Sequence, residues 1–192
     1  MKTIVFDLEM NKPTDKIIQI GANLVDIKRG VILDSFDTFV DPLEPIDPFI
    51  KDLTGIMDSD VQGAPQIVEA LNRFFSWAKD NDCAHFTVWG SDYWVVKNEV
   101  EAQHLLGKEI NIPKKTSQLN LKETALLFRS CFSSAKSRGG LKATIDLFGL
   151  SFTGRQHDAR DDAYNTTKLL LHFKKLVQGA LKFQEILLQE EK

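Results

Sequence analysis

The chain has 192 residues, which is enough for one domain with a sizeable core, although two small domains also fit. Hydrophobic residues make up 43% of it and charged residues 27%, a composition typical of an ordinary soluble globular protein. The formal net charge of −3 excludes an overall positive field, which disfavours a protein that coats nucleic acid. The same charge is compatible with an enzyme that gathers carboxylates around metal ions.

Targeting and redox signals are sparse. The apolar run at residues 3–6 ends at Asp7 and is too short for a signal peptide or a membrane span. We therefore expect a cytoplasmic protein with no membrane partner. Cys83 and Cys131 lack the spacing of a zinc site or a disulfide framework, so we expect two reduced thiols.

The first part of the chain predicts strands. Residues 3–8 are apolar enough for a strand that is buried on both faces. Two further strands are expected over 17–27 and 31–40, joined by a hairpin turn at 28–30. The opening is therefore a three-stranded meander with its first strand inside, and prolines then break the pattern.

Further along, the apolar spacing changes to the helical period. We expect helices over 65–78, 92–106, 120–132, 141–148 and from about 158 onward, a strand over 84–89, and a polar loop over 113–119. The order of elements predicts one α/β domain. We place it at residues 1–180, with a C-terminal helical tail at 181–192 that either extends the last helix or forms a short amphipathic segment.

Asp7 and Glu9 are the first residues with a chemical meaning. Side chains two apart in a strand point to the same face, so both carboxylates would project together from the end of an apolar strand. Burying two carboxylates side by side is costly unless a cation neutralises them. The pair therefore indicates either a metal site or a solvated strand end.

His157 and Asp162 stand at the start of the last predicted helix, with the histidine expected in the loop and Asp162 in the first or second turn. Acidic residues in a first turn are common because they complement the helix dipole, which accounts for Asp158 and Asp161. The dipole does not account for a histidine directly before them. His157 and Asp162 are therefore candidate site residues.

Asp92 follows the strand expected at 84–89, and it is either the N-cap of the next helix or a further carboxylate of a site. Hard cations such as Mg²⁺ or Mn²⁺ prefer carboxylate oxygens, and two of them together can act on a phosphodiester. Such a site needs about four carboxylates and a base that titrates near neutral pH. The chain supplies Asp7, Glu9, Asp92, Asp162 and His157.

Three segments resemble the motifs of the DEDDh (DnaQ-like) 3′–5′ exonucleases. They are FDLEM at 6–10, WGSD at 89–92, and His157-x-Ala159-x-x-Asp162. Further segments look most similar to the branch that trims RNA 3′ ends. These are NLK at 120–122, GL at 140–141, GLSFTGR at 149–155 and DDAYN at 161–165.

This resemblance implies a ribonuclease H-like α/β fold, with a central five-stranded mixed sheet flanked by helices. Residues 150–154 are our candidate for its fifth strand. The resemblance also implies that two divalent cations, Mg²⁺ or Mn²⁺, are bound by the four carboxylates named above, with His157 as general base.

The resemblance implies contacts to substrate as well. Leu53 and Thr54 belong to a segment, 52–56, that cradles the terminal nucleotide in this family. Met10 and Leu53 would pack against its base, and the backbone from Leu8 to Met10 would meet its sugar.

The second motif departs from the pattern of the family. Relatives often carry the acid one place later, where this chain has Tyr93. A loop shortened by one residue would restore the position of Asp92, and we favour this interpretation. In the alternative, Asp92 is only a cap and the site lacks a ligand.

We predict a metal-dependent 3′–5′ exonuclease that releases nucleoside 5′-monophosphates from the end of a single-stranded nucleic acid. The branch that the chain resembles favours RNA over DNA as the substrate. The sequence does not decide between a monomer and a homodimer. Two rival hypotheses are a catalytically impaired nucleic-acid-binding or regulatory protein, and an accessory proofreading subunit of a polymerase.

Overall fold

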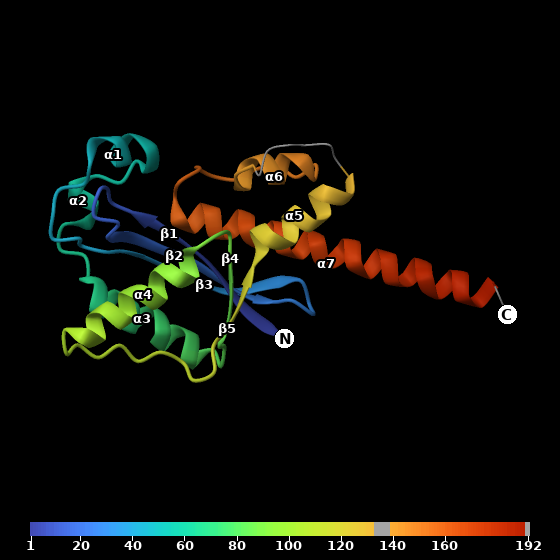
Figure 1. Cartoon of the computed structure of the whole chain (residues 1–192), viewed down its shortest axis with the longest axis horizontal. Coiled ribbons are helices and arrows are strands. Elements are labelled where there is room, and N and C mark those ends of the chain that lie inside the picture. The colour runs from blue at the N-terminus through green and yellow to red at the C-terminus, as the bar shows by residue number, and fades with distance from the viewer. Residues whose placement is uncertain (133–138, 191–192) are drawn as a thin grey trace.

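The computed structural model describes residues 1–132 and 139–190. Its centre is a five-stranded sheet in the order β3-β2-β1-β4-β5 (Figure 1). The strands are β1 (Lys2–Met10), β2 (Ile17–Asp26), β3 (Val31–Phe39), β4 (His85–Val88) and β5 (Ser117–Asn120). β1, β2 and β3 form an antiparallel meander, whereas β4 is parallel to β1 and β5 is parallel to β4. The predictions of a mixed sheet and of a meander with β1 inside are confirmed.

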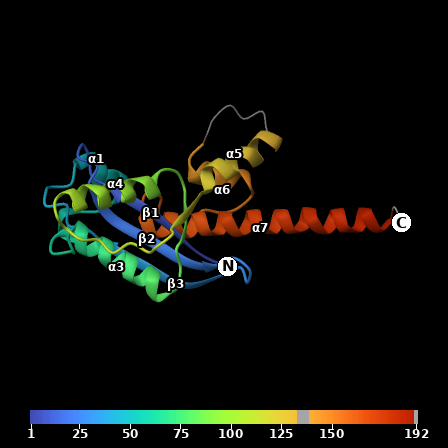
Figure 2. The ribbon, with the colours of Figure 1, turned by 60° about the horizontal axis from the view of Figure 1, so that its bottom comes forward.

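Helices cover both faces of this sheet. They are α1 (Pro48–Thr54), α2 (Asp58–Val61), α3 (Ile67–Asp80), α4 (Asp92–Leu105), α5 (Leu121–Phe132), α6 (Leu141–Leu147) and α7 (Ala159–Glu190). Figure 2 shows α3 and α4 on one side of the sheet and α7 on the other. The helices predicted at 65–78, 92–106, 120–132, 141–148 and from about 158 correspond to α3 to α7 within two residues at their starts.

β1 divides the interior into two main cores because its side chains alternate between the faces. Ile4, Phe6 and Leu8 belong to an aromatic-rich cluster with α3 and α4. Val5 faces the other way and joins a cluster with α5, α6 and α7. By the same alternation, the odd-numbered residues that follow Val5 in β1 point towards α7.

α1 and α2 form a small third cluster beside β2, with Ile18, Ile46 and Ile50 at its centre. The proline-rich segment predicted neither helix. α1 nevertheless has local start and stop signals, since Asp47 accepts a hydrogen bond from the Phe49 N–H and Gly55 ends the helix with φ of 76°. The helix is short, which is why its apolar period was not evident in the sequence.

The fifth strand is not at 150–154, and that prediction is wrong. The fifth strand is β5, which starts inside the segment predicted to be a polar loop. Its residues pair in parallel with β4, from His85 with Ser117 to Val88 with Asn120. Because β5 lies at the sheet edge with mostly exposed side chains, its sequence SQLN shows no apolar alternation. Residues 150–154 form irregular structure, in which Phe152 packs against the α7-side core.

α7 has 32 residues and continues through position 181 without a break. The expected tail is thus an extension of the last helix, and residues 191–192 lie outside the described part. Side chains from 175 to 184 are exposed, and this half of the helix projects from the body (Figure 1). Cys83 is a buried free thiol, whereas the side chain of Cys131 is not among those described. Within the described residues, no helix is long and apolar enough to cross a membrane.

Candidate active site

Asp7 and Glu9 lie near the C-terminal end of β1, on the face that carries α7. Glu9 is buried and Asp7 is partly buried. β1 is the central strand of the sheet, and the segment after the parallel strand β4 leaves the sheet at the same end, since Phe6 pairs with Val88. In α/β sheets, ligands bind at the carboxyl ends of parallel strands, and these carboxylates occupy such a place.

The N-terminus of α7 lies directly on the sheet beside these carboxylates. Gly21 pairs with Asp7 in the ladder. A Cβ atom at Gly21 would lie 2.2 Å from the Arg160 nitrogen and 2.3 Å from the Ala159 carbonyl carbon. Only a glycine therefore allows α7 to approach β2 so closely. The approach brings Asp162, in the first turns of α7, to the acidic end of β1.

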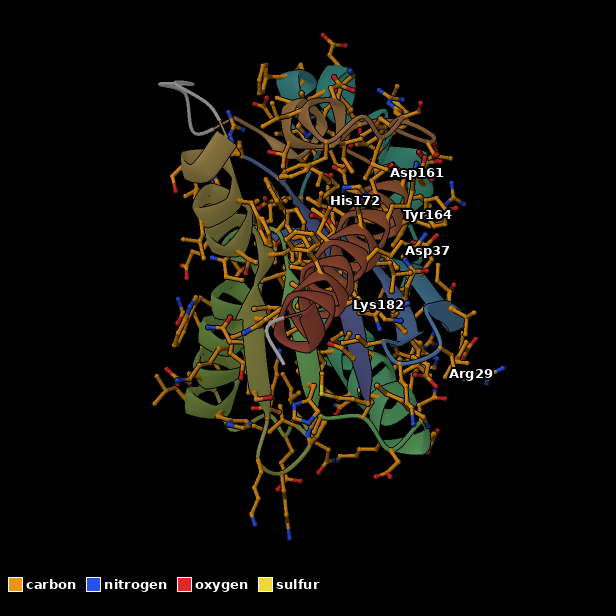
Figure 3. All side chains as sticks on the ribbon, turned by 90° about the vertical axis from the view of Figure 1, so that its right-hand side faces the viewer. Arg29, Asp37, Asp161, Tyr164, His172 and Lys182 are labelled. Atoms are coloured by element: carbon orange, nitrogen blue, oxygen red, sulfur yellow. The ribbon has the colours of Figure 1, made fainter. Side chains whose placement is uncertain are left out.

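Side chains from neighbouring strands fix this helix start. Gln19, which is 1% exposed, accepts a hydrogen bond of 3.0 Å from the Ala159 N–H and donates one of 3.1 Å to Asp37. In Figure 3, which looks along α7, Asp37 and Asp161 lie on the same side of the helix. Gln19 was not among the residues predicted for the site. Its signal is an amide in the otherwise apolar run IIQIGANLV, where a buried polar group needs a partner.

His157 lies in the loop that enters α7, as predicted, and has a left-handed backbone with φ of 61°. Its backbone N–H donates a hydrogen bond of 3.1 Å to the Asp162 carboxylate, while its side chain is exposed. One potential ligand atom from each of Glu9, His157 and Asp162 lies within 4.8 Å of the other two. The structure thus brings together residues from the first and last motifs, which are about 150 positions apart in the chain.

Asp92 is the first residue of α4, and its side chain is 8% exposed. The N-cap position belongs to Ser91, so Asp92 is not the cap that one interpretation of the sequence proposed. Its carboxylate instead takes part in the electrostatics of the cluster, because its charge raises the pKa of both Asp7 and Glu9.

All four carboxylates have raised pKa values, and burial is the largest cause for each. Burial, followed by the charges of Asp162 and Asp92, raises the pKa of Glu9 to about 8. The pKa of Asp92 rises to about 7 and that of Asp162 to about 6, although the His157 N–H bond lowers the latter. The pKa of Asp7 lies well above its usual range, through burial and then the charge of Asp92.

This donor set fits hard divalent cations. Carboxylate oxygens with one imidazole nitrogen are ligands that suit Mg²⁺ and Mn²⁺, whereas a zinc site of the thiolate type needs cysteines. Buried carboxylates that raise one another's pKa are costly to ionise together, and a cation removes this cost. Asp7, Glu9, Asp92 and Asp162 therefore form a candidate metal centre.

The residues expected to contact a terminal nucleotide differ in their exposure. Met10 and Leu53 are partly exposed, whereas Leu8 is 5% and Thr54 is 3% exposed. The Thr54 hydroxyl donates a hydrogen bond of 2.8 Å to the Ile50 carbonyl and accepts one of 3.1 Å from the Ile56 N–H. Thr54 thus secures the end of α1 that presents Leu53, and its hydroxyl is already occupied.

Arg155 links α1 to the His157 loop. Its guanidinium donates hydrogen bonds of 3.3 and 3.4 Å to the carbonyls of Asp52 and Leu53, at the C-terminal end of α1. A Cβ atom at Gly55 would lie 1.7 Å from this guanidinium, so the glycine both ends the helix and admits the arginine. Arg155 is exposed, and through these bonds it connects the end of α1 to the loop that enters α7.

Comparisons with known proteins concern the family and the fold of the chain. A family model described as Exonuclease (RNase_T) matches residues 4–170. The nuclease domain of 3′hExo, a DEDDh family member bound to rAMP, has a TM-score of 0.74 and 19% identity, covering 91% of this chain and 92% of that one. Exonuclease X in complex with 5′ overhanging duplex DNA has a TM-score of 0.62 and 18% identity, with 91% of each chain covered. At these identities the solved structures show a shared fold, and the predicted ribonuclease H-like fold is confirmed.

Curated relatives are much longer proteins. A DNA polymerase III PolC-type protein of Clostridium perfringens is 33% identical over 177 residues, which is 90% of this chain and 11% of the relative. One of Caldanaerobacter subterraneus is 48% identical over 79 residues, or 40% of this chain and 6% of the relative. The chain therefore spans about a tenth or less of the length of the curated relatives that it matches.

Proposed function

The chain belongs to the exonuclease family whose model matches residues 4–170, and from this premise we propose that it is a metal-dependent 3′–5′ exonuclease acting on single-stranded nucleic acid. The observation that carries the proposal is the cluster at the end of β1. Ligand atoms of Glu9, His157 and Asp162 lie within 4.8 Å of one another, beside the raised-pKa carboxylates Asp7 and Asp92. The reaction is hydrolysis of the last phosphodiester, with release of a nucleoside 5′-monophosphate.

Asp7, Glu9, Asp92 and Asp162 would hold two divalent cations, Mg²⁺ or Mn²⁺. When bound, such ions lower the pKa of water and offset charge on the scissile phosphate. The side chains lie on a central strand and on two helix starts, so their positions are set by the folded core. A hard cation is the ligand that best offsets their mutual repulsion.

His157 would accept the proton of the attacking water, as a general base must lie within hydrogen-bond reach of its proton donor. Its exposed side chain stands at the edge of the cluster, and its backbone bond to Asp162 holds the loop in place. Met10 and Leu53 would pack against the terminal base, with the backbone near Leu8 at the sugar. Arg155 would hold Leu53 and the His157 loop in fixed positions relative to each other, since it joins the two segments.

RNA is the substrate that we favour, because the motifs resemble those of the branch that trims RNA 3′ ends. Among the solved structures with this fold is a 3′-exonuclease that recognises the histone mRNA stem-loop. A proofreading exonuclease that serves a DNA polymerase is the second candidate. It is supported by the PolC-type relative, which aligns with 90% of this chain.

Degradation of matched 5′-labelled RNA and DNA single strands, with Mn²⁺, Mg²⁺ or chelator, tests the proposal. We expect a ladder that shortens from the 3′ end and disappears with chelator, with Asp7→Ala and with His157→Gln. Asp80→Asn removes an exposed carboxylate at the far end of α3 and serves as the control. Faster shortening of DNA than of RNA, with a mismatched primer end preferred, would favour the proofreading function. Binding without any shortening would favour the catalytically impaired protein.

A further inference from the structure

A cavity of about 180 Å³ lies on the face of the sheet that carries α3 and α4. Phe6 lines it from β1, and the next residue, Asp7, points to the opposite face of the sheet. Figure 2 shows α3 and α4 on this face and α7 on the other. β1 therefore stands between the cavity and the Asp7 carboxylate, so the cavity is not part of the candidate metal centre.

The walls of the cavity are mostly aromatic. Phe74 and Phe75 line it from α3, Phe86 from β4 and Tyr93 from α4. The rings of Phe75 and Phe86 meet edge to face, with centroids 6.3 Å apart and planes at 87°. Phe86 and Tyr93 are instead tilted by 44°, with centroids 6.1 Å apart. Rings at such different angles offer both faces and edges, which are the surfaces that a further aromatic ring contacts best.

The size of the cavity follows from small side chains on α4. Val96 and Val100, each 5% exposed, line it from successive turns of the helix, where larger residues would fill the space. An apolar cavity of roughly 150 Å³ stays dry and takes up benzene. Sites for drug-sized ligands, which nucleotides match in size, measure roughly 300–1,000 Å³. The volume therefore suits one small ring system and is too small for a nucleotide.

The mouth of the cavity is polar. Lys97, Glu101 and His104 are exposed residues that line it from consecutive turns of α4, so the cavity reaches the surface. Thr116 adds a hydroxyl, which lies 2.9 Å from the Tyr93 hydroxyl. A charged ligand would lose its hydration among the aromatic walls without gaining a buried partner of opposite charge. The lining thus favours an uncharged ring that carries one hydrogen-bonding group at the mouth.

We propose that this cavity binds a small uncharged aromatic molecule, of one ring or two fused rings, and that its occupancy steadies the start of α4. Asp92 is the first residue of α4, and Tyr93 beside it lines the cavity. A ligand packed against Tyr93 restricts this helix start, so that a metal ion bound by Asp92 meets a more ordered site. Binding of the ligand is independent of the proposed exonuclease function, whereas its link to the metal rests on that function.

Indole is the probe for binding, and tryptophan, which adds a charged amino acid group to the same ring, is its control. Titration of the full nitrogen-15-labelled chain, followed by amide chemical shifts, should give a dissociation constant for indole of roughly 0.1–1 mM. The shifts should centre on α4 and residues 112–116, and tryptophan should bind about tenfold more weakly or less. No shifts at these residues, or equal binding of the two probes, would overturn the site as described.

Substitutions then locate the bound ring. Val100→Phe fills the cavity from α4 and should abolish the shifts that indole causes. Val177→Phe makes the same change on the projecting half of α7, where Val177 is 49% exposed, and should bind indole as wild type does. Val100→Leu, which adds one methylene, should weaken binding less and decides the question if Val100→Phe does not fold, as thermal melting checks. A folded Val100 variant that binds indole as tightly as wild type would overturn the assignment to this cavity.

Titration with Mn²⁺ in a calorimeter tests the link to α4. Saturating indole should tighten Mn²⁺ binding to wild type about fivefold, and Mn²⁺ should tighten indole binding by the same factor, because such coupling is reciprocal. Indole should have no effect on Val100→Phe. Equal Mn²⁺ affinity with and without indole would overturn the link. No Mn²⁺ binding in either case would overturn the proposed metal centre and the link with it, while the result for indole would stand.

Discussion

The starts of α4 and α7 each bring one aspartate to the same carboxylate cluster, but they are held in place by different means. At α7, the Asp158 side chain accepts hydrogen bonds from the N–H groups of Arg160 and Asp161, and Gln19 accepts one from Ala159. Asn165, which is fully buried, adds bonds to the entering loop. The backbone of this helix start is thus fixed by polar contacts from several directions.

At α4, the N-cap residue Ser91 makes no side-chain capping bond. In the loop before it, the Gly90 N–H donates a hydrogen bond of 3.2 Å to the Asn120 side chain. The helix is held mainly by packing of Val96 and Val100 into the aromatic-rich core, with one hydrogen bond of 2.9 Å between the Tyr93 and Thr116 hydroxyls near its start. Asp92 is therefore placed mainly by apolar packing and Asp162 mainly by hydrogen bonds, so the site depends on two separate parts of the fold.

The largest expected effect is on activity. Asp92→Asn and Asp162→Asn should each lower kcat by about a thousandfold, since each would remove a ligand worth several kcal/mol of transition-state stabilisation. Single-turnover hydrolysis of a labelled oligonucleotide measures this. If Asp92→Asn remains active, α4 does not contribute a ligand to the metal centre, and only α7 does. Asp80→Asn should match wild type.

The close approach of α7 to β2 is the next target. Gly21→Ala places a Cβ atom against the backbone of Ala159 and Arg160, which cannot yield as a flexible side chain would. We expect a loss of about 1–3 kcal/mol in the free energy of unfolding, together with reduced activity as Asp162 is displaced. Urea denaturation measures the first. Gly179→Ala lies in the projecting part of α7, with no atom within 4 Å of the new Cβ, and should be neutral or slightly stabilising.

The polar contacts at the two helix starts should differ in strength. Asn165 exchanges hydrogen bonds of 3.0 and 2.7 Å with the Thr153 backbone and donates one of 2.8 Å to the Asp161 carbonyl. Asn165→Ala leaves the Thr153 N–H and carbonyl without these partners and should cost about 2–3 kcal/mol of unfolding free energy, whereas Asn120→Ala should cost about 1 kcal/mol. Equal losses in urea denaturation would contradict the unequal support of α7 and α4.

The last expected effect is a pH dependence of stability in the metal-free protein. The folded-state pKa values of Glu9, Asp92 and Asp162 are raised to about 8, 7 and 6. Each group therefore stabilises the fold below its unfolded pKa, and this contribution is lost as pH rises through the folded value. Melting temperature should fall by several degrees from pH 5 to pH 8.

Mn²⁺ should restore more stability at pH 8 than at pH 5, because only the ionised carboxylates bind it well. Asp92→Asn should flatten the pH dependence more than Asp162→Asn does, since its pKa is the more strongly raised of the two. A melting temperature that rises with pH in chelator would contradict the raised pKa values.

Much of this site was predictable from residue types and spacing. Asp7 and Glu9 interrupt an apolar strand, and His157 precedes a helix start, so their chemistry contrasts with their surroundings. The resemblance to DEDDh exonucleases is confirmed by the family match, and the prediction of an exonuclease enzyme is confirmed at the level of the family. The roles of the individual residues, the preference for RNA, the homodimer and the domain limit at 180 stay predictions.

What the sequence could not supply depends on contacts between distant segments. β5 owes its strand form to pairing with β4, because SQLN has no apolar period of its own. The tie from Arg155 to α1 joins residues about 100 positions apart, and neither end has a local signal for the other. Gly21 gives no sign of its role until α7 lies on it.

The length of α7 has a consequence for the protein in solution. At a rise of about 1.5 Å per residue, its 32 residues extend roughly 48 Å. A compact domain of 192 residues would have a radius of gyration of about 16 Å. With half of this helix projecting from the body, the particle tumbles anisotropically and scatters X-rays as an elongated object, with a radius of gyration above the compact value.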